Sequence, residues 1–237
     1  MKRFLFKFLL FLTYPIRLAV RYELNQKADK ILKQTDYMQR VSGSLKTADF
    51  INKNLSQSYA ANNKFELIDY ALKIADTKTK LILEFGVFSG STINFISNKV
   101  ERNVFGFDSF QGLPGKWREG FDKGFFLVSE LPKVNKNCVL IKGWFENSIP
   151  SFLPEHPEDI GFLHVDCDMY SSTKTIFDMI GSKIKSGTVI VFDDYFNYDS
   201  WLEGEHKAWT EFVENNSVKF EYLGYVKNSE QIAVVIK

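Results

Sequence analysis

The chain has 237 residues, of which 45% are hydrophobic and 25% are charged, as in folded globular proteins. This length allows one large α/β domain with a full core, or a smaller domain with attachments. The formal net charge of +1 argues against a general attraction to nucleic acid, so no nucleic-acid partner is expected. The two cysteines, Cys138 and Cys167, fit no metal-ligand spacing and favour a reducing, cytoplasmic compartment.

Residues 1–22 form a basic and aromatic segment. Its longest uncharged run, residues 8–16, is far shorter than the roughly 20 residues that a membrane-spanning helix needs. On a helical wheel the basic residues share one sector of about 140°, which favours a helix lying on the inner face of an anionic membrane. Packing against a partner subunit or against the rest of the chain is an equally good interpretation. The basic residues are Lys2, Arg3, Lys7, Arg17 and Arg21.

The next segment, residues 23–63, is polar with a weak helical recurrence, and we interpret it as a helical appendage or lid. From residue 64 to residue 237 the pattern alternates between strands and helices. Helices are predicted over 65–77, 91–100 and 171–187, the last ending at Gly187. Buried strands are predicted over 80–87, 103–110, 137–145, 160–168 and 187–196, followed by a β-hairpin over 219–237.

This alternation predicts an α/β fold with a Rossmann-like, doubly wound, mostly parallel sheet of seven strands. The terminal hairpin predicts an antiparallel edge. In such sheets ligands bind beyond the carboxyl ends of the strands. Four of the five predicted strands before the hairpin end in acidic residues, which would crowd negative charge onto one rim unless a cation or hydroxyl groups bind there. These residues are Glu84, Asp108, Asp166 with Asp168, and Asp193 with Asp194.

The turn "EFGVFSG", residues 84–90, indicates which cofactor binds. It lacks the G-x-G-x-x-G pattern of dinucleotide-binding turns and the lysine of a phosphate-binding loop. A glycine turn without these features suits a cofactor without phosphates, and S-adenosylmethionine is the obvious candidate. Glu84 could meet its amine, and Asp108 could accept both ribose hydroxyls.

At this point the sequence resembles the macrocin O-methyltransferase-like (TylF) family. The resemblance rests on "LEFGVFSGST", "VFGFDSFQGLP", "IKGWFENSIP", "LHVDCDMYSST" and "VIVFDDYF", in that order, and covers residues 64–237. It implies a class I methyltransferase fold and an S-adenosylmethionine-dependent sugar O-methyltransferase that uses Mg²⁺. Carried over to this sequence, it implies Asp166, Asp193 and Asp194 as metal ligands and Asp168 as the general base, with Asp166 also at the catalytic centre.

The expected cofactor contacts lie in the glycine turn and at the neighbouring strand ends. Trp144 and Phe145 could flank the adenine or could equally pack in the core. Gly143 is expected to allow a close backbone approach. His164 is expected to be a satisfied core histidine, and His206 to lie at the surface. The full set is Glu84, Phe85, Gly86, Gly90, Ser91, Thr92, Asp108, Ser109, Gly143, Trp144, Phe145 and Asp166.

The sequence therefore predicts methyl transfer to a hydroxyl of a sugar, a glycosylated small molecule or a glycan. A catechol-like acceptor without an obligatory metal is one alternative, because a catechol chelates a cation equally well. A non-catalytic, membrane-associated protein that binds the cofactor is another, although the complete acidic set speaks against it. The acceptor and the formation of a homo-oligomer are not determined by any motif.

Overall fold

The computed structural model describes residues 13–237, and it confirms the predicted α/β class. One eight-stranded sheet has the order β1-β7-β8-β6-β5-β2-β3-β4. All neighbouring strands are parallel except β8, which is antiparallel to β6 and β7. The strands are β1 (Tyr59–Ala61), β2 (Leu81–Phe85), β3 (Val104–Asp108), β4 (Cys138–Lys142), β5 (Ile160–Val165), β6 (Val189–Phe192), β7 (Phe220–Val226) and β8 (Ile232–Ile236).

The sheet differs from the predicted one at its antiparallel end. The hairpin β7–β8 forms as expected, but the edge of the sheet is β1, which pairs in parallel with β7. The eighth strand comes from residues 59–61, which precede the alternating pattern. Three residues are too few to show the two-residue periodicity by which a strand is recognised in a sequence.

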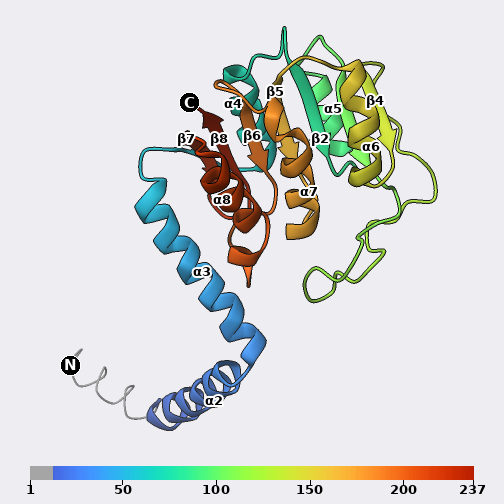
Figure 1. Ribbon diagram of the computed structural model, residues 1–237. Coiled ribbons are helices and arrows are strands. Elements are labelled where there is room, and N and C mark those ends of the chain that lie inside the picture. Colours follow the sequence, from blue (N-terminus) through green and yellow to red (C-terminus); the bar gives the residue numbers. More distant parts are fainter. Residues whose placement is uncertain (1–12) are drawn as a thin grey trace.

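Helices cover both faces of the sheet (Figure 1). Helices α4 (Lys64–Ile74) and α5 (Ser91–Ser97) pack on one face. Helices α6 (Phe145–Phe152), α7 (Tyr170–Ile180) and α8 (Glu205–Asn216) pack on the other. Single 3₁₀ turns follow α6 and α7 and precede α8, over Leu153–Glu155, Gly181–Lys183 and Trp201–Glu203.

Local sequence explains why these elements begin and end where they do. Strand β2 lies inside the sheet and is buried on both sides, so four of its five residues are apolar and the fifth is Glu84. Helix α4 begins after Asn63, whose side chain accepts a hydrogen bond from the backbone N–H of Glu66. The helix predicted to extend to Gly187 instead ends at Ile180. The next residue is Gly181, which has low helix propensity and lies where a Cβ would be 2.6 Å from the Phe212 ring.

Helices α2 (Tyr14–Leu32) and α3 (Thr35–Asn54) extend away from the sheet (Figure 1). No residue of α2 is buried, whereas the second half of α3 packs against the chain that follows β6. Thr47 accepts a hydrogen bond from the backbone N–H of Asn197, and Trp201 donates one to the carbonyl of Gly43. Within residues 13–237, no helix is long and apolar enough to cross a membrane.

Candidate functional site

A cavity of about 710 Å³ lies at the carboxyl ends of β2, β3, β5 and β6. It is bounded by the turn after β2, the long loop after β3, the starts of α6 and α7, and the residues after β6. This is the position at which doubly wound sheets bind ligands. Most of the residues predicted for the site line this cavity: Gly86, Ser91, Thr92, Asp108, Ser109, Trp144, Phe145, Asp166, Asp168, Asp193 and Asp194.

Four predicted cofactor contacts lie outside this lining. Glu84 and Phe85 are fully buried in β2, and Phe85 stacks on the ring of Phe107. Gly90 precedes α5 with a φ of 79°, and Gly143 follows β4 with a φ of 151°, so both shape the backbone that leads to the cavity. A side chain on β2 that points into the sheet packing cannot reach a ligand beyond the strand end, because the sheet itself intervenes.

The glycine turn is held in place from two sides. Gly86 has a φ of 94°, and a Cβ at this position would lie only 1.6 Å from the carbonyl oxygen of Asp166. The Asp108 carboxylate accepts hydrogen bonds from the backbone N–H groups of Val87 and Phe88, both at 2.8 Å, and from that of Phe110 at 2.7 Å. These bonds use three of its roughly four acceptor positions. Asp108 therefore orders the turn and keeps about one position for a ligand hydroxyl.

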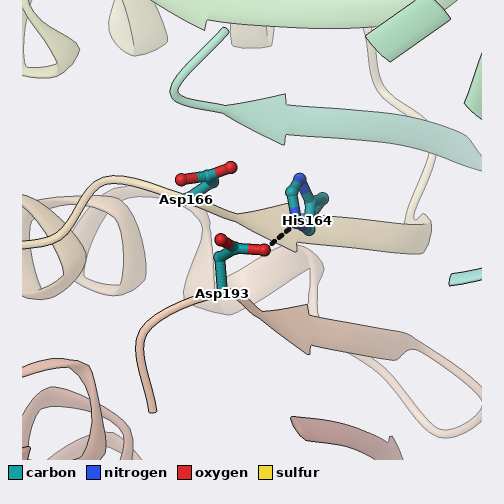
Figure 2. Close-up of side chains that lie close together, drawn as sticks. All are labelled: His164, Asp166 and Asp193. Carbon is teal, nitrogen blue, oxygen red and sulfur yellow. Dashed lines mark ion pairs between the residues drawn. The ribbon is translucent and has the colours of Figure 1, made fainter. Parts of the chain in front are cut away.

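Asp166 and Asp193 lie side by side at the ends of β5 and β6 (Figure 2). The ammonium of Lys64, the first residue of α4, lies 3.8 Å from Asp166 and 3.4 Å from Asp193. Burial opposes the charge on Lys64, but the two carboxylates outweigh this effect and raise its pKa. Burial and the proximity of Asp193 raise the pKa of Asp166 well above its ordinary value. Two carboxylates thus share one cation position, and no sequence motif indicated that Lys64 would occupy it.

His164 is buried, as expected, but it is not a satisfied core histidine. Its Nδ1 lies 2.9 Å from a carboxylate oxygen of Glu84, its neighbour on β2. Its Nε2 forms an ion pair of 3.6 Å with Asp193 (Figure 2) but has no hydrogen-bond partner in the described part of the chain. Burial disfavours the imidazolium, yet Asp193 and Glu84 raise the pKa of His164 to about 10. The spacing of two between His164 and Asp166 was the available signal, because it places both side chains on one face of β5.

A second acidic group forms on the other side of the site. Asp168 and Asp194 lie close enough for each to influence the pKa of the other, and burial followed by the charge of Asp193 raises the pKa of Asp168 to about 7. Glu205, the first residue of α8, is fully buried and accepts hydrogen bonds from the backbone N–H groups of Cys167 and Asp194. Adjacent residues at a strand end diverge, so Asp194 joins this group while Asp193 faces Lys64. Sequence reasoning had given Glu205 no role.

The long loop between β3 and β4 closes one wall of the cavity. Its Arg118 lies over the Trp117 ring at 3.9 Å and forms an ion pair of 3.0 Å with Glu230, in the turn between β7 and β8. Trp117 and Phe121 from the same loop also line the cavity. The loop is therefore anchored across the site by a charge pair that no local motif indicates.

The donors at the site fit a divalent cation. The carboxyl groups of Glu84, Asp166, Asp168, Asp193, Asp194, Glu205 and Glu230 face three basic groups, those of Lys64, His164 and Arg118. Carboxylate oxygens are the ligands that Mg²⁺ prefers. Asp166 and Asp193 converge with His164 so that one ligand atom from each lies within 4.8 Å of the others, whereas Asp194 is not part of this group.

Comparison with known proteins supports these observations. Residues 83–195 match a family model described as a methyltransferase domain. Among solved structures, the calicheamicin methyltransferase CalS11 is similar with 20% identity and a TM-score of 0.58, covering 73% of this chain and 77% of that one. The O-methyltransferase NovP is similar with 19% identity and a TM-score of 0.56, covering 72% and 78%. A search of curated proteins gave no match. Residues 83–195 are thus similar to a methyltransferase domain, and the similarity to these solved structures shows the class I methyltransferase fold.

Proposed function

We propose that the protein is an S-adenosylmethionine-dependent O-methyltransferase of the macrocin O-methyltransferase-like (TylF) family, acting on a hydroxyl of a sugar, a glycosylated small molecule or a glycan. The observation that carries this proposal is the shared cavity. The glycine turn, which suits a cofactor without phosphates, lines it together with Asp108 on one side. Asp168, Asp193 and Asp194 line it on the other side. A methyl donor and a hydroxyl acceptor can therefore meet within one cavity.

The cofactor half of the cavity matches the parts of S-adenosylmethionine. The free acceptor position of Asp108 suits a ribose hydroxyl, and Ser91, Thr92 and Ser109 offer hydroxyl groups to the polar parts of the cofactor. Trp144 lies at the start of α6 and lines the cavity, where its ring can cover the adenine. Phe145 lines the cavity too but packs edge-on against Phe85, so it serves the core and the site together.

The acceptor half supplies a base and a means of holding the hydroxyl. A sugar hydroxyl is a poor nucleophile, so its proton must leave as the methyl group transfers. Asp168 lines the cavity beside Asp194 and is the group placed to receive this proton. Mg²⁺, when bound at Asp166 and Asp193, would lower the pKa of the hydroxyl and stabilise the negative charge that develops.

The solved structures give the substrate class its support. One structure similar to this chain, with 20% identity and a TM-score of 0.53, is described as a TDP-rhamnose 3'-O-methyltransferase. It covers 73% of this chain and 78% of that one. The aromatic wall formed by Trp117 and Phe121 suits the apolar face of a sugar ring. A catechol would bind the same cation, so an activity assay must distinguish a sugar acceptor from a catechol.

The test is methyl transfer from labelled S-adenosylmethionine to a panel of nucleotide sugars and catechols, with and without Mg²⁺. Asp168→Asn should lower kcat at least about a hundredfold, the usual contribution of a general base, while cofactor affinity stays within about threefold. Asp178→Asn is the matched control, because this exposed aspartate on α7 pairs only with Lys174 among the described residues. Equal activity of Asp168→Asn and wild type would refute the assigned base.

We further propose that the protein acts in the cytoplasm and binds the inner membrane surface through residues 1–22. Residues 1–12 lie outside the described part of the chain. In α2, the apolar side chains of Ile16, Leu18 and Val20 are exposed next to Arg17 and Arg21. Sedimentation with anionic but not with neutral vesicles would support this proposal, and loss of binding on deleting residues 1–22 would map it. A dimer in light scattering would instead favour a subunit contact.

A further inference from the structure

The cation position between Asp166 and Asp193 contains one feature that an all-carboxylate site lacks. His164 is 0% exposed, and among residues 13–237 its Nε2 has no hydrogen-bond partner and interacts with Asp193 only as an ion pair. This nitrogen lies 3.6 Å from Asp193 and on the same face of β5 as Asp166 (Figure 2). A buried ring nitrogen without a hydrogen-bond partner costs free energy unless a ligand engages it.

The opposite nitrogen of the same ring is already held. Glu84 lies 2.9 Å from Nδ1, and the two residues are paired in register on adjacent strands. Because Glu84 holds the Nδ1 proton, it is the Nε2 proton that a cation would displace, and this is the usual arrangement behind a histidine that binds a metal. This gives Glu84 a role even though it lies outside the cavity lining.

The distances suit a small divalent ion. One atom each from His164, Asp166 and Asp193 lies within 4.8 Å of the other two. Ligands at about 2.1 Å from one ion are about 3 to 4 Å apart, so the three groups need to close by only about 1 Å. The ammonium of Lys64 already stands 3.4 Å from Asp193 and 3.8 Å from Asp166, where it neutralises the pair.

We propose that the divalent cation of this site is held by Asp166, Asp193 and the Nε2 of His164, with Glu84 orienting the ring, and that Lys64 takes the cation's place in the metal-free protein. The inference rests on the metal site of the proposed function and replaces Asp194 as the third ligand. On binding, the ion takes the place of any proton on Nε2, which passes to solvent, and the Lys64 side chain swings away. Asp194 stays with Asp168 and Glu205.

The experiment uses Mn²⁺, which accepts both carboxylate and imidazole ligands and is paramagnetic. Tag-free protein is titrated with Mn²⁺ by calorimetry, and the complex is examined by pulsed electron paramagnetic resonance for coupling to a ligand ¹⁴N. The wild type should show an imidazole coupling. His164→Gln should lose it and bind Mn²⁺ at least about tenfold more weakly, whereas Asp194→Asn should keep it with affinity within about threefold.

Two further variants test the same ligand assignment if His164→Gln fails to fold. The chain has three histidines, so a protein carrying His156→Gln and His206→Phe retains only His164, and its imidazole coupling must persist. Lys64→Met should tighten Mn²⁺ binding about tenfold by removing a competing charge, while Lys174→Met should not change it. Lys174 is the control because it forms its ion pair with Asp178 on α7.

Other outcomes overturn the inference. If Mn²⁺ binds without ¹⁴N coupling and this binding is lost in Asp194→Asn, the third ligand would be Asp194 and not His164. Absence of Mn²⁺ binding, with S-adenosylhomocysteine still binding in a parallel titration, would remove the metal site and leave the methyltransferase proposal intact. If S-adenosylhomocysteine also failed to bind, the proposed function itself would fall.

Discussion

The guanidinium of Arg118 lies 3.0 Å from the carboxylate of Glu230, and this pair joins the loop after β3 to the turn between β7 and β8. The same guanidinium lies 5.1 Å from the ring of Tyr198 and 4.0 Å from Asp194. Both partners of the pair are largely shielded from water, so the attraction is stronger than that of a typical surface pair. The pair fixes the wall of the cavity on the acceptor side.

Breaking this pair should loosen the wall. Arg118→Gln is expected to raise the KM for the acceptor about tenfold while the affinity for S-adenosylmethionine stays nearly unchanged, because the cofactor side of the cavity does not depend on the pair. Steady-state kinetics and cofactor titration measure both quantities. Arg102→Gln, which breaks a comparable pair with Glu158 away from the cavity, is the control. An unchanged KM in Arg118→Gln would show that the loop is held by its aromatic contacts alone.

A side chain at Gly86 should destabilise the whole domain. In Gly86→Ala the Cβ would lie 1.6 Å from the Asp166 carbonyl oxygen, so β2 and β5 would have to separate. We expect a loss of at least about 2 kcal/mol in the free energy of unfolding beyond that of Gly120→Ala. Gly120 also has a positive φ, of 85°, but no atom within 4 Å of an added Cβ. Urea unfolding of both variants separates steric overlap from backbone strain, and equal losses would contradict the close approach.

Asp108 should matter to cofactor binding through the turn that it holds. An amide in Asp108→Asn offers one acceptor oxygen where the carboxylate offers two, so at least one of the bonds to Val87, Phe88 and Phe110 is lost. We expect the Kd for S-adenosylmethionine to rise about tenfold or more, as measured by calorimetry. Asp49→Asn, a change at an exposed position on α3, should leave this Kd as it is.

The stability of the fold should fall with acid through His206. A surface position was expected, but its ring packs against Phe50, Tyr195 and Trp201, and burial lowers its pKa to about 4. The unfolded chain takes up this proton near pH 6.5, and the folded chain takes it up only near pH 4. Stability contributed by neutral His206 is therefore complete above about pH 6.5 and declines as the pH falls toward 4.

Between pH 7 and pH 5 this histidine should account for a loss of at most about 2 kcal/mol in the free energy of unfolding. His206→Phe keeps the ring contacts and removes the titration. The free energy of unfolding of the wild type should therefore fall relative to that of His206→Phe as the pH falls. Urea unfolding at several pH values measures it. A pH-independent difference would show that His206 titrates normally in the folded state.

Sequence alone determined the order of strands β2 to β8 along the chain, the helices between several of them, and the positions of most cavity residues. Each buried strand is an apolar run, and each run ends at a polar residue where the chain leaves the sheet, so Asp108, Asp166 and Asp193 could be placed at one rim. The glycine turn could be identified from its glycines. Gly86 and Gly90 adopt positive φ, which few other residues tolerate. These signals are local, because backbone geometry over a few residues produces them.

Only the tertiary structure decided which of these groups meet. Lys64 reaches Asp193 across 129 positions, His164 meets Glu84 across 80, and Arg118 meets Glu230 across 112. Strand β1 was missed for the same reason, since it exists through its pairing with β7. The energy of such contacts depends on burial and on the sum of neighbouring charges, and neither quantity is written in the residues next to each group.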